Sequence, residues 1–281
     1  MNPLAEICQP ESERIATMYT FICENSIDGI FTGVYDAWAS KYGHQNVRLV
    51  SDHLENFELF HEYVTVIPDS EKSEKVARTL RSRLSKEVYA EMCQAILASE
   101  LTTHKKSLDK ADCIYHTIVL GLSMRDGSKV LQALGDPYVQ RIFELSRATF
   151  NESHHLLGFL RFSELENQVL FATIHPKNQV LPILAEHFTD RLPMENFIIY
   201  DENRKLAAVH KASKNYLIVD ASSLNQDIIK RYSQKELEYR KLWCGFFESI
   251  AIDARKNPKL QSQNIPKRFW KDAIELADLP K

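Results

Sequence analysis

The chain has 281 residues, of which 44% are hydrophobic and 26% charged, with a net charge of −3 and a mean hydropathy of −0.32. This composition is typical of a globular protein with one large or two modest domains. No apolar run reaches the roughly 18–20 residues that a membrane span requires. The first residues lack the apolar core of a signal peptide, so we expect a cytoplasmic protein with no membrane partner.

The first part of the chain predicts a strand, a helix and two further strands. Residues 17–23 are β-branched and aromatic, and apolar residues with helical spacing follow them, with Ser26 as the N-cap. The helix should end by Gly43. Further strands are expected at residues 47–50 and 62–67, the second closed by a proline.

Helices are predicted next, interrupted by a polar loop at residues 101–107. The expected N-caps are Asp69 or Ser70 for the first of them, Ser85 for the next and Asp136 for the last. The helix beginning at Asp109 should bury its apolar face in a core. The last of them starts with Pro137, which favours the first helical position, and extends to about Leu160.

After Ser163 the apolar pattern changes from helical to alternating. It predicts strands at 169–174, 196–200, 205–210 and 215–219, with a short helix at 181–191. These strands should form a small antiparallel sheet. A last helix starts at the capping box of Ser233 and Glu236, and it should end near Asn257 because Pro258 follows.

These elements predict an α+β fold, with a helix-rich N-terminal half and a small antiparallel sheet with helices in the C-terminal half. We expect a division into an N-terminal extension at 1–16, a mainly helical subdomain at 17–150, an α+β subdomain at 151–222, and a C-terminal helix with a basic tail at 223–281.

The basic tail is the most distinctive segment of the chain. Residues 254–271 contain six cations and no acid, so the other residues sum to −9. The cations are Arg255, Lys256, Lys259, Lys267, Arg268 and Lys271. A basic segment on an acidic body predicts a local site for an anionic partner such as a nucleic acid. Phe269 and Trp270 could stack on bases, or they could pack onto the body as hydrophobic anchors.

A second candidate site lies on the helix that contains residues 147–161. Arg147, Asn151, His154 and Arg161 share one face with Gly158, an arrangement suited to a phosphate or carboxylate ligand. Alternatively, the arginines pair with acids of the chain such as Glu164 and Glu166. The adjacent face should be core, and its residues are Phe143, Phe150, Leu157 and Leu160.

The turn at 175–178 joins a predicted strand to a helix, and its Lys177 and Asn178 could meet a ligand or lie in an ordinary solvated turn. The five cysteines are scattered and form no C-x-x-C pair, so we expect small core residues and no zinc or iron–sulfur site. No metal and no cofactor is therefore predicted. The remaining candidates for a hydrolytic site are His154, His155, His187 and Asp190.

Several short motifs spread along the chain together indicate a family resemblance. They lie at residues 128–130, 136–138, 143–147, 154–155, 160–165, 176–178, 187–191, 255–259 and 266–270. Together they resemble an uncharacterised bacterial family named "probable DNA metabolism protein". The resemblance extends from about Met18 to Trp270. Relatives carry tyrosine where this chain has Phe269, so a hydrogen-bonding role at that position is not expected here.

The resemblance implies a role in DNA metabolism or repair. Similar proteins are encoded beside a DNA modification or repair protein of the radical-SAM class, and similar domains are fused to uracil-DNA-glycosylase-like domains. We therefore expect a nucleic-acid-binding accessory protein whose partner supplies the iron–sulfur cluster. The alternatives are a nuclease or other base- or phosphate-processing hydrolase, and a protein–protein adaptor.

Overall fold

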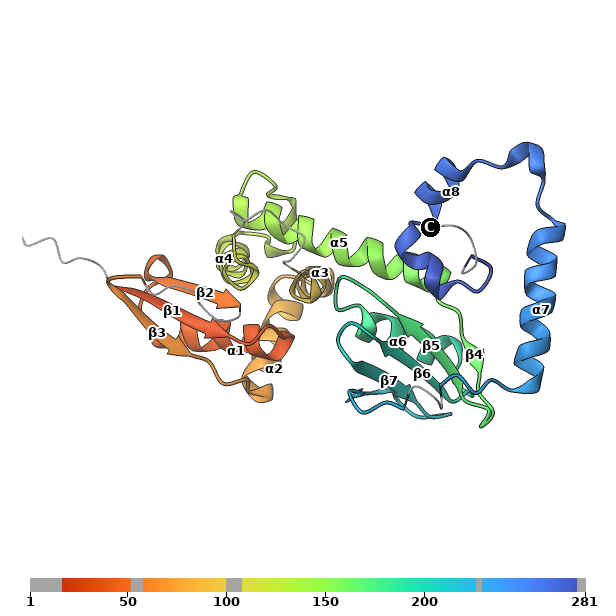
Figure 1. The fold of residues 1–281 in the computed structure, drawn as a ribbon. Helices are drawn as coiled ribbons and strands as arrows, with labels where there is room; N and C mark the ends of the chain where they lie inside the picture. Colours follow the sequence, from red (N-terminus) through yellow and green to blue (C-terminus); the bar gives the residue numbers. More distant parts are fainter. Residues whose placement is uncertain (1–16, 52–57, 100–107, 226–228, 277–281) are drawn as a thin grey trace, which may run out of the picture. The chain divides into compact units, whose positions relative to one another are not determined.

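The computed structural model describes residues 17–51, 58–99, 108–225 and 229–276. The chain forms two compact units. Unit 1 contains Met1–Ile96 and Thr103–Glu144, and unit 2 contains Leu97–Thr102 and Leu145–Lys281 (Figure 1). The predicted boundary at residue 150 thus falls after Glu144 instead, within helix α5 (Pro137–Phe159). The C-terminal helix and tail, expected as a separate part, belong to unit 2. The predicted extension at 1–16 and loop at 101–107 lie outside the described residues.

Unit 1 contains a three-stranded parallel sheet. Strand β1 (Met18–Cys23) lies between β2 (Val47–Ser51) and β3 (His61–Thr65), and both neighbours run parallel to it. Helix α1 (Ile27–Ser40) connects the first two strands, and the Ser26 hydroxyl caps it by accepting the Gly29 N–H. The strand–helix–strand–strand order predicted from the sequence is confirmed.

The edge of this sheet at β2 is covered by carboxylates of helix α4 (Lys110–Ser123). Asp112 accepts the backbone N–H of Leu49 at 3.0 Å, and Asp109 accepts that of Ser51. An uncovered edge strand is a template for unwanted pairing, and these bonds remove it. Burial of Asp112 raises its pKa above the ordinary value, although the Leu49 N–H opposes the shift.

The remaining helices of unit 1 begin where the capping residues predict. Asp69 caps α2 (Ser70–Arg83), and the Ser85 hydroxyl accepts an N–H in the first turn of α3 (Lys86–Leu97). Among the described residues of the unit, 3₁₀ segments also lie at His44–Asn46 and Gly127–Gln132. All of these caps depend on neighbours in the sequence, which explains why the sequence predicted them.

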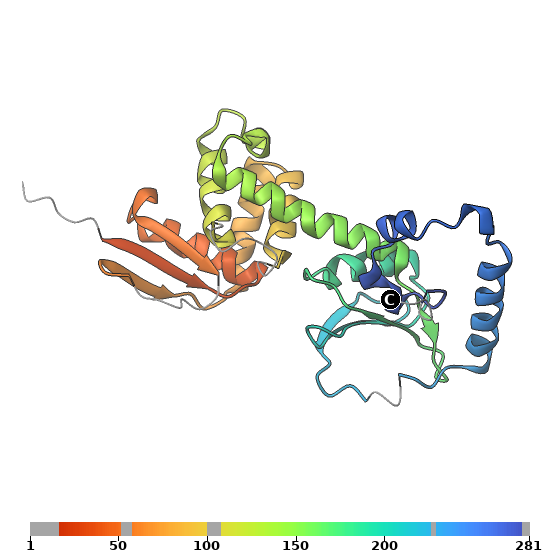
Figure 2. The same ribbon diagram turned by 45° about the horizontal axis from the view of Figure 1, so that its top comes forward.

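Unit 2 is built on a five-stranded sheet whose strands lie side by side in chain order (Figures 1 and 2). The strands are β4 (Ser163–Glu164), β5 (Leu170–Ile174), β6 (Phe197–Asp201), β7 (Leu206–His210) and β8 (Leu217–Asp220). The pairings of β4 with β5, β6 with β7 and β7 with β8 are antiparallel, as predicted for this sheet, whereas β5 and β6 run parallel, which the prediction missed. Helix α6 (Leu181–Arg191) is long enough to carry the chain back to the start of β6, as a parallel connection requires.

Each face of this sheet carries a cluster of buried residues, whereas the edge strand β8 is exposed. Residues Ala172, Ile199 and Ala208 point to a core shared with α6 and with the second half of α5. Their neighbours Phe171 and Tyr200 belong to a second cluster on the opposite face, which Leu224 and Tyr232 complete. This alternation is the period of two that a β-strand imposes.

Helix α7 (Gln234–Ser249) has no buried residue and stands clear of the sheet in Figures 1 and 2. Its first turn is held by Arg240, which bonds both to Glu236 at 2.8 Å and to the Ser163 hydroxyl at 2.6 Å. The helix ends at Ser249, earlier than the predicted end near Asn257. Asn257 instead caps a further short helix.

That short helix is α8 (Pro258–Asn264), in which Pro258 occupies the first turn. Two 3₁₀ segments flank it, at Asp253–Arg255 and Lys267–Asp272. No helix within the described ranges combines the length and apolar character that crossing a bilayer requires.

Candidate functional site

The predicted ridge on α5 is only partly available to a ligand. Arg147, Asn151 and His154 are exposed, and the Phe150 ring stacks on the His154 ring with centroids 6.1 Å apart. Arg161 is half-buried. It donates to the carbonyls of Gly158 and Leu160 at the end of α5, where cations are favoured.

Arg161 also ties the tail to α5. Its guanidinium donates to the Glu275 carboxylate at 2.8 Å, so the alternative of internal pairing is correct for Arg161, although the partner is neither Glu164 nor Glu166. Burial alone would raise the pKa of Glu275. Hydrogen bonds from Arg161, its own backbone and Trp243 outweigh burial and leave this pKa below the ordinary value.

The predicted core face of α5 is partly wrong. Phe143 and Phe150 are 37% and 53% exposed, whereas Leu160 is buried. The buried face is rotated and contains polar residues among the apolar ones: Ser146, Thr149, Glu152 and Ser153 lie between Leu145 and Leu156. Glu152 and Ser153 have hydrogen-bond partners there, whereas the buried Thr149 hydroxyl has none among the described residues. An apolar pattern does not reveal such buried polar positions.

Glu152 is the central residue of this buried face, and no pattern in the sequence predicted it. Its side chain is 2% exposed. One carboxylate oxygen accepts the Lys177 N–H at 3.0 Å and pairs with Arg268 at 3.1 Å, and the other accepts the Asn178 N–H at 2.7 Å. A buried carboxylate with three donors joins α5, the turn after β5 and the C-terminal tail.

The turn at 175–178 is held from both sides. Asn178 is buried, and its side-chain amide accepts the Ser99 N–H at 2.9 Å and donates to the Ala148 carbonyl at 3.3 Å. Asn178 is therefore a structural residue, and its predicted contact with nucleic acid is not supported. Lys177 is exposed, as a phosphate contact requires.

The carboxyl ends of the parallel strands β5 and β6 meet at this turn. His175 and Glu202 follow the two strands and form an ion pair. Arg204 donates to the Pro176 and Lys177 carbonyls and pairs with Asp201 at 3.1 Å. Burial raises the pKa of Asp201, with Arg204 opposing the shift. Ligands bind at such strand ends in many open sheets.

The aromatic residues of the tail pack inside unit 2. Phe269 is 2% exposed and lies in the core that contains Leu156 and Leu160, with its ring centroid 5.9 Å from that of His155. Trp270 is 8% exposed and donates its indole N–H to the Ile265 carbonyl at 2.8 Å. Of the two alternatives for these rings, the structure has the packed one, and it leaves no free ring face for stacking on a base.

The cations of the tail divide into two groups. Arg268 is committed to the buried Glu152 and lies over the Phe269 ring, with 4.5 Å between the guanidinium and the ring centroid. The other cations with described side chains are exposed: Arg255, Lys256, Lys259 and Lys267. The side chain of Lys271 lies outside the described residues.

The candidate hydrolytic residues are not brought together. His154 is exposed on α5, and His155 turns toward Phe269. His187 and Asp190 are exposed on α6. Across the described residues, no three histidine, cysteine, aspartate or glutamate side chains are placed to hold one metal ion.

The comparisons with known proteins place the chain in a family of unknown function. The chain belongs to the family described as a domain of unknown function, DUF4130, whose model matches residues 108–275. No curated protein matches. A solved chain titled as the DHH domain of a member of a family of ribosomal proteins is 12% identical, with a TM-score of 0.32 over 70% of this chain and 74% of that chain.

Proposed function

We propose that the protein is a nucleic-acid-binding accessory protein of DNA metabolism. The observation that supports this most directly is the exposed cation cluster of the tail, formed by Arg255, Lys256, Lys259 and Lys267, in a stretch without acids. Phosphate contacts from such a cluster supply affinity that does not depend on base sequence. Exposed Lys177, together with Arg147 and His154 on α5, adds further groups of unit 2 that suit phosphate.

The anchoring of the tail strengthens this proposal. Arg268, Phe269 and Trp270 fix its end to the body through Glu152 and the core of unit 2. Asn257 caps α8 by accepting the Leu260 N–H at 3.0 Å, which orders the segment carrying Lys259. Cations on an ordered segment lose less conformational entropy on binding than those on a flexible one.

The resemblance to the DNA metabolism family supports a partner for this accessory role. The partner would be a DNA-modifying protein of the radical-SAM class, or a uracil-DNA-glycosylase-like protein. The accessory protein would hold the nucleic acid, and the partner would carry out the reaction with its own cofactor.

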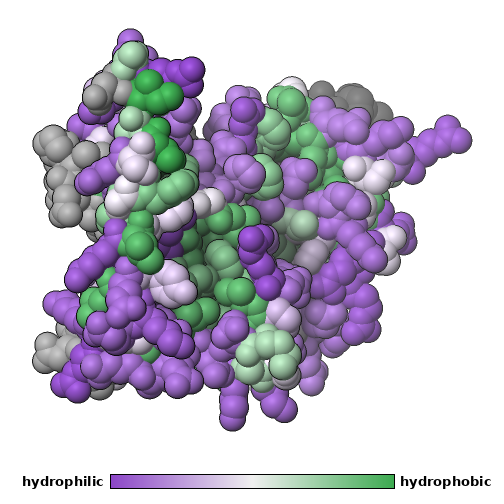
Figure 3. All heavy atoms as spheres, turned by 90° about the vertical axis from the view of Figure 1, so that its right-hand side faces the viewer, coloured by the Kyte–Doolittle hydropathy of each residue, from purple (hydrophilic) through white to green (hydrophobic). Residues whose placement is uncertain are grey.

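One observation favours an adaptor as the second candidate. Helix α7 exposes Tyr239, Leu242, Trp243, Phe246 and Ile250, each at least 43% accessible. The side view in Figure 3 faces this part of the molecule and shows hydrophobic residues at its surface among hydrophilic ones. Large apolar groups exposed together often mark protein interfaces.

Binding of fluorescein-labelled single- and double-stranded DNA at several salt concentrations tests the proposal. The variant K256Q/K259Q/K267Q should weaken binding equally for unrelated sequences. The slope of log K against log salt should flatten by about 0.7–0.9 for each phosphate that the variant no longer neutralises.

A charge-matched control separates a local site from a general charge effect. The variant K211Q/K214Q/K241Q removes the same charge from exposed positions of unit 2 outside the tail. It should bind with the wild-type salt slope. If the wild-type protein binds no DNA or RNA even at low salt, or if both variants lose affinity alike, the proposal is wrong. Co-purification of a partner without nucleic acid would then favour the adaptor.

A further inference from the structure

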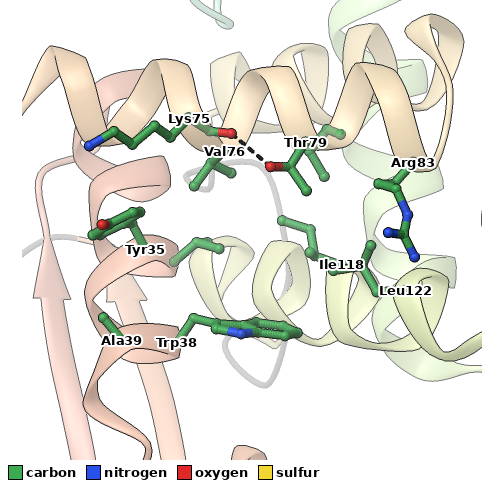
Figure 4. Close-up of a pocket in the computed structure, with 11 residues that line it drawn as sticks. Tyr35, Trp38, Ala39, Lys75, Val76, Thr79, Arg83, Ile118 and Leu122 are labelled. Atoms are coloured by element: carbon green, nitrogen blue, oxygen red, sulfur yellow. Dashed lines mark hydrogen bonds between the residues drawn. The ribbon is translucent and has the colours of Figure 1, made fainter.

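Unit 1 contains a groove that the proposed function does not use. It has a volume of about 600 Å³ and lies between α1, α2 and α4 (Figure 4). This volume is in the range of about 300–1,000 Å³ that small-molecule sites occupy. The groove joins α1 and α2, which precede the residues matched by the family model, to α4, which lies within them.

The walls of the groove are apolar. Side chains of Val76, Ile118 and Leu122 face one another across it, and the ring of Trp38 lies along one side (Figure 4). Trp38 is 44% exposed, although its ring is large and apolar. The Thr79 hydroxyl donates to the Lys75 carbonyl of its own helix at 2.8 Å, so its proton is used and towards a ligand it can only accept. A sugar or a base would find few partners here, whereas a hydrocarbon chain would fit.

The charged residues that line the groove are both cations. Lys75 and Arg83 lie toward opposite ends of the α2 wall (Figure 4), and no acid is among the lining residues. Within the described part of the chain neither forms an ion pair, although the Asp69 carboxylate is near enough to Lys75 to interact with it electrostatically. Other cations of α2 do: Lys72 pairs with Asp36 at 2.7 Å, and Arg81 pairs with Glu74 at 3.4 Å.

These features complement one another. Lys75 is also placed 5.6 Å from the centroid of the Tyr35 ring, which holds its ammonium beside the groove. Two such cations at the rim of an apolar cavity would repel a cationic amphiphile. A neutral sugar would also bind poorly, because the cavity is apolar. The two cations would stabilise an anion whose hydrocarbon part fills the cavity.

We propose that this groove binds a small anionic amphiphile, an aliphatic carboxylate whose chain contacts Trp38, Val76 and Ile118 and whose carboxylate pairs with Lys75 or Arg83. The size of the cavity favours a free small molecule over a folded partner segment. The site is independent of the basic tail, since it is formed only by residues of unit 1.

Fluorine NMR of the full chain labelled with 5-fluorotryptophan tests this proposal. The protein has three tryptophans, of which Trp38 lines the groove and Trp243 and Trp270 do not. The Trp38→Phe variant assigns the Trp38 resonance. Decanoate, added below its micelle concentration, should shift that resonance saturably. Decyltrimethylammonium, with the same chain and the opposite charge, should shift it far less.

Two variants test the apolar cavity and its two cations separately, and a third serves as the control. Thr79→Phe places a ring in the groove from an exposed position and should weaken decanoate binding about tenfold or more. K75Q/R83Q should weaken it about fivefold. R78Q/K86Q removes the same charge from exposed positions outside the lining and should bind as the wild type does.

Several results would overturn the proposal. These are an unmoved Trp38 resonance, an equal response to both amphiphiles, or equal losses in K75Q/R83Q and R78Q/K86Q. A shift of Trp243 alone would place the amphiphile on α7, and would likewise refute a site in the groove.

Discussion

At the scale of single residues, the buried carboxylate of Glu152 joins three parts of unit 2. Its carboxylate holds two backbone N–H groups of the turn after β5 and the guanidinium of Arg268. Removing the charge of a buried, hydrogen-bonded carboxylate costs more than removing an exposed one, because its partners stay buried and lose their acceptor.

We therefore predict that Glu152→Gln destabilises the protein by about 2–4 kcal/mol. The amide keeps one acceptor oxygen but turns an N–H₂ group toward a donor. Urea denaturation measures the change, with Glu166→Gln as the control because Glu166 is exposed. Equal stability of the two variants would show that the three bonds to Glu152 contribute little.

The sequence could not have identified Glu152, and the reason is physical. Its partners are Lys177, Asn178 and Arg268, and nothing local to α5 indicates that they come near. The burial of Asn178, and the choice between the two alternatives left open for Phe269, depend on tertiary contacts in the same way. Each has a residue type suited to ligand contact, but tertiary contacts bury both.

At the scale of elements, signals local in sequence predicted the structure well. Ser26, Asp69 and Ser233 cap their helices as expected. Signals that depend on tertiary contact failed. The parallel pairing of β5 and β6 was missed because alternating hydrophobicity does not encode strand direction. The start of α7 was recognised from its cap, but not that unit 2 leaves the large apolar residues of this helix exposed.

The tail and α7 should therefore respond differently to the same substitution. Phe269→Ala should cost about 3–5 kcal/mol, because it removes a ring that is 2% exposed in the core. Phe246→Ala should cost less than about 1 kcal/mol, because that ring is 53% exposed on α7. Chemical denaturation of both variants measures these costs. A similar cost for both would mean that something covers α7 in solution.

At the scale of the whole molecule, the basic tail both carries a high positive charge and supplies side chains to the packed interior of unit 2. The stretch at 254–271 carries six cations, whereas the other residues sum to −9. The same stretch supplies Phe269 to the main core of unit 2 and Trp270 to a smaller cluster with Ala273 and Leu276. The tail cannot be removed as a dispensable appendage, and a deletion does not test its charge alone.

A chain truncated after Ile252 should therefore melt about 5–10 °C lower than the full chain, because the core loses Phe269 and α5 loses the pairs to Arg268 and Glu275. It should also bind a hydrophobic dye through the uncovered core. K256Q/K259Q/K267Q should melt within about 2 °C of the wild type, since these side chains are exposed. Differential scanning calorimetry beside DNA binding separates the two effects. If the truncated chain keeps the wild-type melting temperature, the tail is not part of the core, and loss of DNA binding on truncation would then report its charge directly. If it melts lower as expected, only the lysine variants can assign affinity to the tail.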